Sequence, residues 1–171
     1  MSHDPYVMWA TQCIRTVVTT GKTPAIPDDL PLDMHQEKAG VFVSIKAHGH
    51  LRGCMGTLVA TKPDISREIM SNAVSASMRD PRFPAIKTHE LDDLVISVDV
   101  LKPSEEIDSV QGLDPSRFGI IVRKGFRTGV LLPGIEGVDT VESQIRIALE
   151  KAGIKEDENF VIERFEVERH H

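Results

Sequence analysis

Residues 41–56 read VFVSIKAHGHLRGCMG, and this stretch predicts the β-hairpin on which the rest of the fold can be built. Over residues 41–47, apolar side chains alternate with other side chains, which is typical of a strand with its more apolar face inward. His48-Gly49-His50 supplies a turn, and the return strand is expected to continue through Val59. The sequence therefore predicts an antiparallel pair of strands as the start of a sheet.

The return strand places a thiol between two glycines, in the string LRGCMG at residues 51–56. Side chains alternate along a strand, so Arg52 and Cys54 are expected on one face. A nearby guanidinium favours the thiolate, which is the nucleophilic form of cysteine. We therefore take Cys54 and Arg52 as candidate catalytic residues, and Gly53 and Gly56 as candidate substrate-binding positions where the backbone can meet a ligand closely. The alternative is that Cys54 is a small buried packing residue.

Nearby histidines allow two other interpretations of Cys54. His48 and His50 could join Cys54 as metal ligands, but the hairpin offers no fourth ligand, so no metal site is expected. His48, His50 or His89 is also a candidate base for a cysteine and histidine dyad. No cofactor is expected, because the sequence has no phosphate-binding glycine loop, no dinucleotide fingerprint and too few cysteines for a radical iron–sulfur cluster. Any radical step would then belong to a partner protein.

The string LRGCMG closely resembles the LRGCIG signature of the AMMECR-type domain, from which it differs only by Met55 in place of isoleucine. Later strings resemble the family's further blocks and occur in the same order: Asp80-Pro81-Arg82-Phe83-Pro84, Glu90-Leu91, Gly129-Val130-Leu131-Leu132-Pro133 and Lys151-Ala152-Gly153-Ile154. The resemblance extends over roughly residues 38–155. Bacterial and archaeal proteins of this type are called AmmeMemoRadiSam system protein A, after their association with a Memo-like protein and a radical S-adenosylmethionine (SAM) enzyme.

The resemblance implies an α+β fold, with a mainly antiparallel sheet flanked by helices and a smaller lobe forming a cleft near the signature. It also makes the loop at Asp80–Pro84 the expected opposite wall of that cleft, with Arg82 available for a carboxylate or phosphate. Asp80, Arg82 and Glu90 are therefore candidate substrate-binding residues, and the Memo-like protein and the radical SAM enzyme are the expected partners. The alternative is an ordinary surface loop in which Asp80 caps the chain and Arg82 is solvated.

Further elements are predicted from apolar periodicity and helix caps. Helices are expected to begin at Asp4-Pro5, Lys62-Pro63-Asp64 and Asp139-Thr140, and to end at Gly21, Asp80-Pro81 and Gly153. Strands are expected at 94–101, at 119–123 and 127–132 as a second hairpin, and at 160–167, where a break at Glu163-Arg164 would divide the last strand. Because strands and helices do not alternate regularly, this pattern also favours an α+β fold.

Two of these segments carry more specific expectations. The strand at 94–101 is apolar on nearly both faces, which is typical of a central strand that is covered on each side. Residues 22–39 contain three prolines and are expected to form an irregular segment, pinned to the core by Leu30 and Leu32.

The composition is that of a globular protein. The chain has 171 residues, 40% hydrophobic and 27% charged, which suits one domain over residues 1–171 with room for a small subdomain packed on the main sheet. The net charge of −6 disfavours nucleic-acid binding. Two cysteines fit a reducing compartment, and the sequence has neither a signal peptide nor an apolar run long enough for a membrane span, so a cytoplasmic protein is expected.

Two functional hypotheses follow. In the first, the chain is an enzyme, or the substrate-handling subunit of one, whose Cys54 contacts a small anionic substrate held by Arg52 or Arg82. In the second, it is a non-catalytic module that binds a ligand, a peptide or the Memo-like partner. Under the first hypothesis, Cys54 is expected to react with a thiol reagent faster than Cys13, which lies on the apolar face of the first helix.

Overall fold

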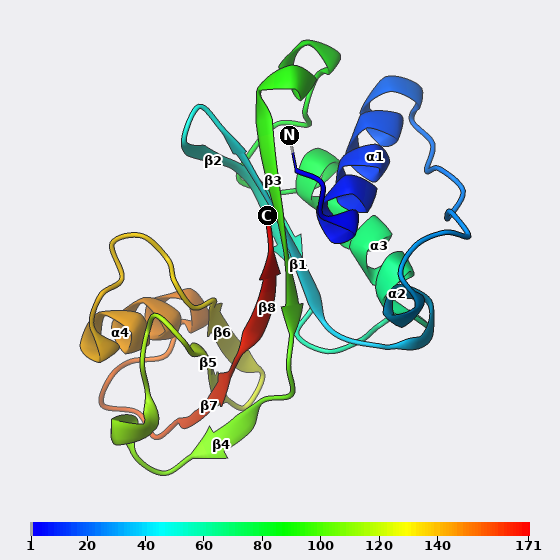
Figure 1. Cartoon of the computed structure of the whole chain (residues 1–171). Coiled ribbons are helices and arrows are strands. Elements are labelled where there is room, and N and C mark those ends of the chain that lie inside the picture. Colours follow the sequence, from blue (N-terminus) through cyan, green and yellow to red (C-terminus); the bar gives the residue numbers. More distant parts are fainter. Residues whose placement is uncertain (1) are drawn as a thin grey trace. The chain divides into compact units, whose positions relative to one another are not determined.

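The computed structural model describes residues 2–171 and shows an α+β fold with two antiparallel sheets (Figure 1). The chain divides into two compact units, Met1–Leu101 with Glu168–His171, and Lys102–Val167. Each unit has one four-stranded sheet and its own apolar core. The predicted fold class is confirmed, whereas the expected cleft and the assignment of residues 1–171 to a single domain stay predictions.

The first sheet has the strand order β2-β1-β3-β8. Its strands are β1 (Val41–Ala47), β2 (His50–Gly56), β3 (Leu94–Leu101) and β8 (Val167–His170). The predicted hairpin is confirmed, because β1 and β2 pair antiparallel with Ser44 opposite Cys54. The turn residues His48 and Gly49 have φ angles of 52° and 80°, and positive φ at both positions matches the twist of the flanking strands.

Two long helices, α1 (Pro5–Thr20) and α3 (Ile65–Met78), cover the apolar side of this sheet (Figure 1). Both begin where the sequence predicts, because the carboxylates of Asp4 and Asp64 accept hydrogen bonds from the first backbone N–H groups. The core combines both helices with β1 and β3, through residues that include Trp9, Ile14, Ile69, Ala73, Val43, Ile45 and Val98. No helix within residues 2–171 combines the length and the apolar character needed to cross a membrane.

The strand β2 ends at Gly56 and does not continue to Val59 as predicted. Residues 57–62 instead bend around the carboxylate of Glu68 on α3, which is only 1% exposed. Thr61 donates to Glu68 from both its backbone N–H and its hydroxyl, each at 2.6 Å. A buried charge requires such partners, so the chain leaves the strand to supply them.

The segment at 22–39 contains a short helix, α2 (Leu32–Gln36), which the sequence analysis missed. Leu32 does not pin the segment, because its side chain is 67% exposed. Met34 is the residue that is fully buried, and Leu30 packs against the core as expected. The proline that precedes α2 does not oppose a helix, because a first-turn N–H has no partner within the helix.

The strand β3 is interior to the sheet but is covered unevenly. Val98 is fully buried, whereas Val95 near the start of the strand is 66% exposed. The prediction of cover on both faces is therefore wrong at this end, because α1 and α3 lie on the same side of the sheet (Figure 1).

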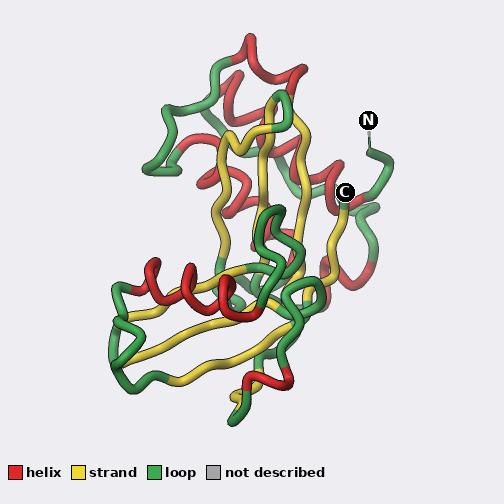
Figure 2. The backbone as a smooth tube through the Cα atoms, turned by 90° about the vertical axis from the view of Figure 1, so that its left-hand side faces the viewer, coloured by secondary structure: helices red, strands yellow, loops and turns green. Residues whose placement is uncertain are grey.

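The second unit contains the sheet β4-β7-β5-β6 with one long helix, α4, packed against it (Figure 2). Its elements are β4 (Glu105–Ile107), the short 3-10 helix η2 (Val110–Gly112), β5 (Gly119–Lys124), β6 (Arg127–Leu131), α4 (Val141–Ala152) and β7 (Val161–Phe165). The second predicted hairpin is confirmed by the antiparallel pairing of β5 and β6. The strand β4 was not predicted, because it is short and carries two glutamates.

The strand expected at 160–167 is in fact two strands, β7 and β8, which belong to different sheets. The chain breaks at Glu166, whereas Glu163-Arg164 lies inside β7. At the end of β8, the ring of His170 stacks on Tyr6 of α1 with 3.8 Å between the ring centroids. Local periodicity does not reveal this change of partners, because β7 and β8 are both extended.

Candidate functional site

Cys54 lies on β2, which is the edge strand of the first sheet. Its Sγ is 3.3 Å from Oγ of Ser44, the residue directly opposite on β1. Its backbone N–H donates to Oδ2 of Asp80 at 3.0 Å, and its carbonyl oxygen accepts from Nη2 of Arg82 at 3.3 Å. The loop at Asp80–Pro84 thus binds both backbone groups that Cys54 would otherwise present unpaired at the sheet edge.

Asp80 is a buried carboxylate, only 4% exposed, that holds this loop against the strand. Besides the N–H of Cys54, it accepts hydrogen bonds from the backbone N–H of Arg82 at 3.0 Å and from the Arg82 guanidinium at 3.1 and 2.8 Å. The side-chain hydrogen bonds from Arg82 are the main cause that lowers the pKa of Asp80 to about 2. The side chain of Arg82 stays 53% exposed, so its guanidinium is accessible to a ligand.

The guanidinium of Arg52 pairs with a carboxylate, and not with the thiol of Cys54 that the sequence suggested as its neighbour. Ile45 of β1 pairs with Gly53, and the next residue of β1 pairs with Leu51, so Arg52 is the extra residue of a β-bulge. The alternation that predicted Arg52 beside the thiol therefore does not hold at this point. The guanidinium of Arg52 binds Glu90 instead.

The contact between Arg52 and Glu90 is a two-pronged ion pair. Nε and Nη2 of Arg52 donate to the two carboxylate oxygens of Glu90 at 2.9 and 3.2 Å. Glu90, on the 3-10 helix η1 (Thr88–Asp93), also accepts from the backbone N–H of Lys87 at 2.7 Å. The hydrogen bonds from Arg52 are the main cause that lowers the pKa of Glu90. Both side chains are mostly buried, and the pair ties β2 to η1, while a role for either in substrate binding or catalysis stays a prediction.

The surroundings of Cys54 raise the pKa of its thiol. Burial is the main cause that raises the pKa of the Cys54 thiol, and the carboxylates of Asp80 and Asp99 add to this shift. The hydrogen bond with Ser44 and the positive charge of Arg82 oppose it. On balance these surroundings favour the thiol over the thiolate, and the thiolate expected from the sequence stays a prediction.

Close packing explains why glycine occupies positions 53 and 56 of the signature. A Cβ on Gly53 would lie 2.2 Å from the carbonyl oxygen of Ala76 on α3, and a Cβ on Gly56 would lie 2.2 Å from the ring of Phe42. Both distances are far below van der Waals contact, so the helix and the ring pack directly onto bare backbone. A role for either glycine in substrate binding stays a prediction beside this structural role.

Cys54 belongs to the face of the sheet that points away from α1 and α3, because its partner Ser44 alternates with the buried residues of β1. Two cross-strand rows lie on this outer face: Cys54, Ser44 and Ser97, followed by Gly56, Phe42 and Asp99. Ser44 is a partner of the thiol that the sequence did not predict. The turn alone would pair Ser44 with Gly53, and only the bulge at Arg52 shifts the register so that Ser44 lies opposite Cys54.

The histidine alternatives find no support in the geometry. Within residues 2–171, Ser44 is the side chain that hydrogen-bonds to the thiol of Cys54, while His48 lies 3.7 Å from Asp93. In the same residues, no three or more histidine, cysteine, aspartate and glutamate side chains are grouped so that they could hold a metal ion.

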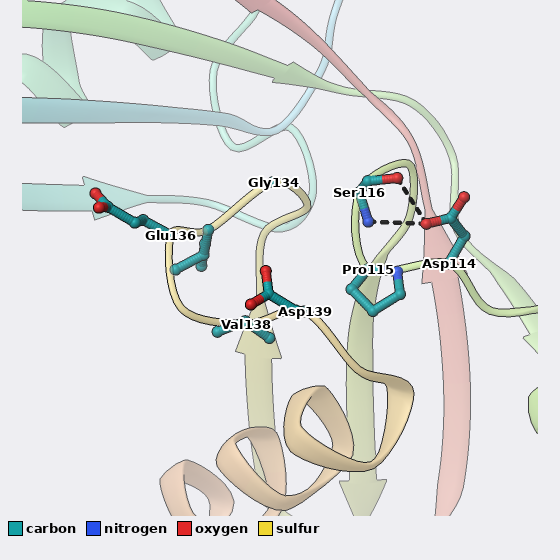
Figure 3. A pocket seen from close by; sticks show the side chains of 8 residues that line it. Asp114, Pro115, Ser116, Gly134, Glu136, Val138 and Asp139 are labelled. Carbon is teal, nitrogen blue, oxygen red and sulfur yellow. Dashed lines mark hydrogen bonds between the residues drawn. The ribbon is translucent and has the colours of Figure 1, made fainter.

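A hollow of about 390 Å³ in the second unit contains none of the candidate residues (Figure 3). Its lining includes three acidic side chains, Asp114, Glu136 and Asp139. Asp114 is turned toward Ser116, whose N–H and hydroxyl donate to the same carboxylate oxygen at 3.0 and 2.6 Å (Figure 3). The Asp114 carboxylate is thus already satisfied by its own loop.

A pH series of alkylation tests which arginine acts on the thiol. We expect the pH midpoint of Cys54 alkylation to lie above the ordinary thiol pKa of 9.0. The substitution Arg82→Gln should raise this midpoint further, because it removes a positive charge and leaves Asp80 uncompensated, whereas Arg52→Gln should leave it unchanged. Peptide mapping by mass spectrometry after brief alkylation measures the rate of Cys54 alkylation at each pH in the native protein and in both variants.

Cys13 provides the internal control in the same protein. It is fully buried, and burial raises the pKa of its thiol to about 12, so it should react more slowly than Cys54. A midpoint that moves with Arg52→Gln and not with Arg82→Gln would contradict the geometry.

Comparison with known proteins relates the whole chain to one family. A family model with the description AMMECR1 matches residues 7–170. A protein from Thermotoga maritima is 49% identical over 172 residues, which cover 99% of both chains. A crystal structure of an uncharacterized protein from Pyrococcus horikoshii superposes with a TM-score of 0.88 at 32% identity, covering 96% of this chain and 88% of that one. A protein from Clostridium acetobutylicum is 46% identical over 98% of this chain, but the match spans only 36% of that longer relative.

Proposed function

The chain belongs to the AMMECR1 family, and from this premise together with the geometry around Cys54 we propose that it is a ligand-binding accessory subunit, and not an enzyme with a permanently ionised cysteine. The observation that carries the proposal is the partly buried, hydrogen-bonded thiol of Cys54 beside an accessible Arg82. Covalent catalysis by cysteine requires a thiolate, and burial opposes its formation here.

The proposed ligand is a small anion that reaches the edge of the sheet at Arg82. The Asp80 carboxylate orients the Arg82 guanidinium by accepting hydrogen bonds from its Nε and Nη2. The exposed part of the Arg82 side chain can then bind a carboxylate or phosphate. Beside it, Cys54 and Ser44 present a thiol and a hydroxyl on the outer face of the sheet. Such groups can orient a bound ligand by weak hydrogen bonds without reacting with it.

The subunit is proposed to act with a Memo-like protein and a radical SAM enzyme, as in the AmmeMemoRadiSam system. Support for this assignment is the resemblance of residues 51–56 and 80–84 to the family's signature blocks. A binding subunit needs no cofactor of its own, so the radical chemistry would reside in the partner. We also propose a cytoplasmic location, which is supported by the two free cysteines, Cys13 and Cys54.

One observation favours the competing function, covalent catalysis by Cys54. The hydrogen bond between Ser44 and Cys54 and the charge of Arg82 both lower the pKa of the thiol, against the larger effect of burial. A bound substrate that displaced the Asp80 carboxylate from this neighbourhood would remove one of the charges that disfavour the thiolate.

Reconstitution with the two proposed partner proteins separates these functions. For a binding subunit, Cys54→Ser should retain both complex formation and the partner's release of 5′-deoxyadenosine from SAM, whereas Arg82→Gln should reduce that release about tenfold by weakening the anion contact. Complex formation is followed by size-exclusion chromatography and product release by liquid chromatography. Arg15→Gln, an exposed arginine on α1, is the matched control. Loss of product release in Cys54→Ser with an intact complex would overturn the proposal in favour of covalent catalysis.

A further inference from the structure

Lys46 of β1 lies on the same outer face of the first sheet as Cys54. The residues of β1 alternate between buried and more exposed, and Phe42, Ser44 and Lys46 form its outer row. The pairing of β1 with β3 continues without a shift through Lys46, so the bulge at Arg52 changes the course of β2 and leaves the alternation of β1 intact. Lys46 is therefore the outer neighbour of Ser44, about 6–7 Å farther along the strand.

The charge of Lys46 is uncompensated. Its side chain is exposed and forms no ion pair or hydrogen bond within residues 2–171. The cross-strand neighbours of Lys46 are apolar, Leu51 on β2 and Val95 on β3, and no carboxylate flanks it there. Asp99 is the other charged residue in these outer rows of β1, β2 and β3, and it is already bound by Arg169. Lys46 therefore makes this part of the face positive, although the chain has a net charge of −6.

Lys46 and Arg82 can both reach a point above the thiol of Cys54. Nη2 of Arg82 is 3.3 Å from the carbonyl oxygen of Cys54, and the charge of Arg82 acts on the thiol. On the other side, Ser44 lies between Lys46 and Cys54, with its Oγ 3.3 Å from Sγ of Cys54. The flexible four-carbon stem of a lysine can extend over so small a residue. The two cations are thus separated by a hydroxyl and a thiol, and not by a bulky side chain.

The hydroxyl of Ser44 provides a further donor at the same place. When the thiol of Cys54 is protonated it can donate to Oγ of Ser44, and the hydroxyl hydrogen is then available to a ligand. A guanidinium, an ammonium and a hydroxyl would converge on one anionic group. A phosphate group has three acceptor oxygens for these donors, whereas a carboxylate has two.

We propose that Lys46 is a second cationic binding residue of this site, and that the ligand carries a phosphate monoester above Ser44 and Cys54, between Lys46 and Arg82. This inference rests on the anion site proposed at Arg82 and goes beyond it by choosing phosphate over carboxylate. A phosphate monoester, with a second pKa of about 6, carries nearly two negative charges above neutral pH. It can therefore accept charge-assisted hydrogen bonds from both cations, while a carboxylate has a single charge to share between them.

NMR titration of the full chain with two small probes tests this inference. The probes are methyl phosphate and acetate at pH 8, where methyl phosphate carries nearly two negative charges and acetate carries one. Methyl phosphate should bind about fivefold more tightly than acetate, because the second charge pairs with the second cation. The backbone amide signals of Ser44 and Cys54 should shift with both probes, while that of Cys13 in the core should not.

Charge variants identify the cation responsible. Lys46→Gln should weaken the binding of methyl phosphate about fivefold and leave that of acetate nearly unchanged, so that the preference for phosphate disappears. Arg82→Gln should weaken the binding of both probes. Lys22→Gln removes the same charge next to the C-terminal end of α1, which packs on the opposite face of the sheet, and should have no effect. Lys46 and Lys22 are exposed, so circular dichroism should report an intact fold.

The outcomes separate this inference from the function on which it rests. If Arg82→Gln weakened both probes while Lys46→Gln kept the preference for methyl phosphate, the role of Lys46 would be overturned and the anion site at Arg82 would remain. An equal loss in Lys22→Gln would also overturn the role of Lys46. Binding that shifts neither Ser44 nor Cys54, or that Arg82→Gln does not weaken, would overturn both proposals.

Discussion

Gly53→Ala is expected to lower the free energy of unfolding of the first unit by about 3 kcal/mol, because the new methyl group meets the backbone of α3. The Cβ would lie 2.2 Å from the carbonyl oxygen of Ala76, which belongs to the backbone of the last turn of α3 and cannot rotate away as a side chain could. The helix or the strand must therefore shift. Urea denaturation followed by fluorescence of Trp9 measures the loss, since this single tryptophan is buried in the first unit.

Gly21→Ala separates steric overlap from backbone strain. Gly21 has φ of 73°, but a Cβ there would meet no atom within 4 Å, so only the strain of the left-handed conformation is added. That strain costs about 1 kcal/mol. If Gly53→Ala were no more destabilising than Gly21→Ala, α3 would not pack on bare backbone at the signature, and the case for Gly53 as a ligand contact would strengthen.

Asp80→Asn should lower the free energy of unfolding by about 2 kcal/mol and detach the Asp80–Pro84 loop from the strand. The carboxylate accepts from the backbone N–H of Cys54, the backbone N–H of Arg82 and two guanidinium nitrogens. An asparagine offers one acceptor oxygen, and its amide nitrogen would face a donor. The remaining N–H groups would then lie unpaired in a buried place.

The same residue predicts the acid limb of the stability curve. Its pKa in the folded chain is about 2, below the ordinary value of 3.8, so the stabilisation from Asp80 is fully present above about pH 5 and is lost as the pH falls toward 2. The amount is on the order of 2 kcal/mol. Urea denaturation at several pH values should therefore show a steeper loss between pH 5 and pH 2 in the native protein than in Asp80→Asn.

Asp92→Asn is the matched control for both effects, because the Asp92 side chain is 91% exposed and its one ion pair within residues 2–171 is with the exposed Arg15. The substitution should change the free energy of unfolding by less than about 0.5 kcal/mol. An Asp80→Asn protein with unchanged stability and an unchanged acid limb would show that the loop is not held by this carboxylate.

Much of the fold was predictable because its signals are local. The alternation of residues 41–47 depends only on the pleat of a strand, and the caps at Asp4 and Asp64 depend on hydrogen bonds to the next residues of the chain. The break between β7 and β8 was predicted at Glu163-Arg164 but lies at Glu166, because its position does not depend on local signals. Which sheet each strand joins is decided by distant partners, and periodicity contains no record of them.

For the site, the sequence by itself determined which groups are present: a thiol between two glycines, and an Asp-Pro-Arg loop. It also determined that the thiol lies on a hairpin strand. Only the tertiary structure decided their chemistry. A one-residue bulge at Arg52 breaks the alternation of the strand, and the Arg52 guanidinium forms an ion pair with Glu90. The fold also brings the side chains of Asp80 and Arg82 into hydrogen bonds with the backbone of Cys54. The pKa of a thiol depends on its burial and on charges within a few ångströms, and those distances arise only when segments far apart in the chain pack together.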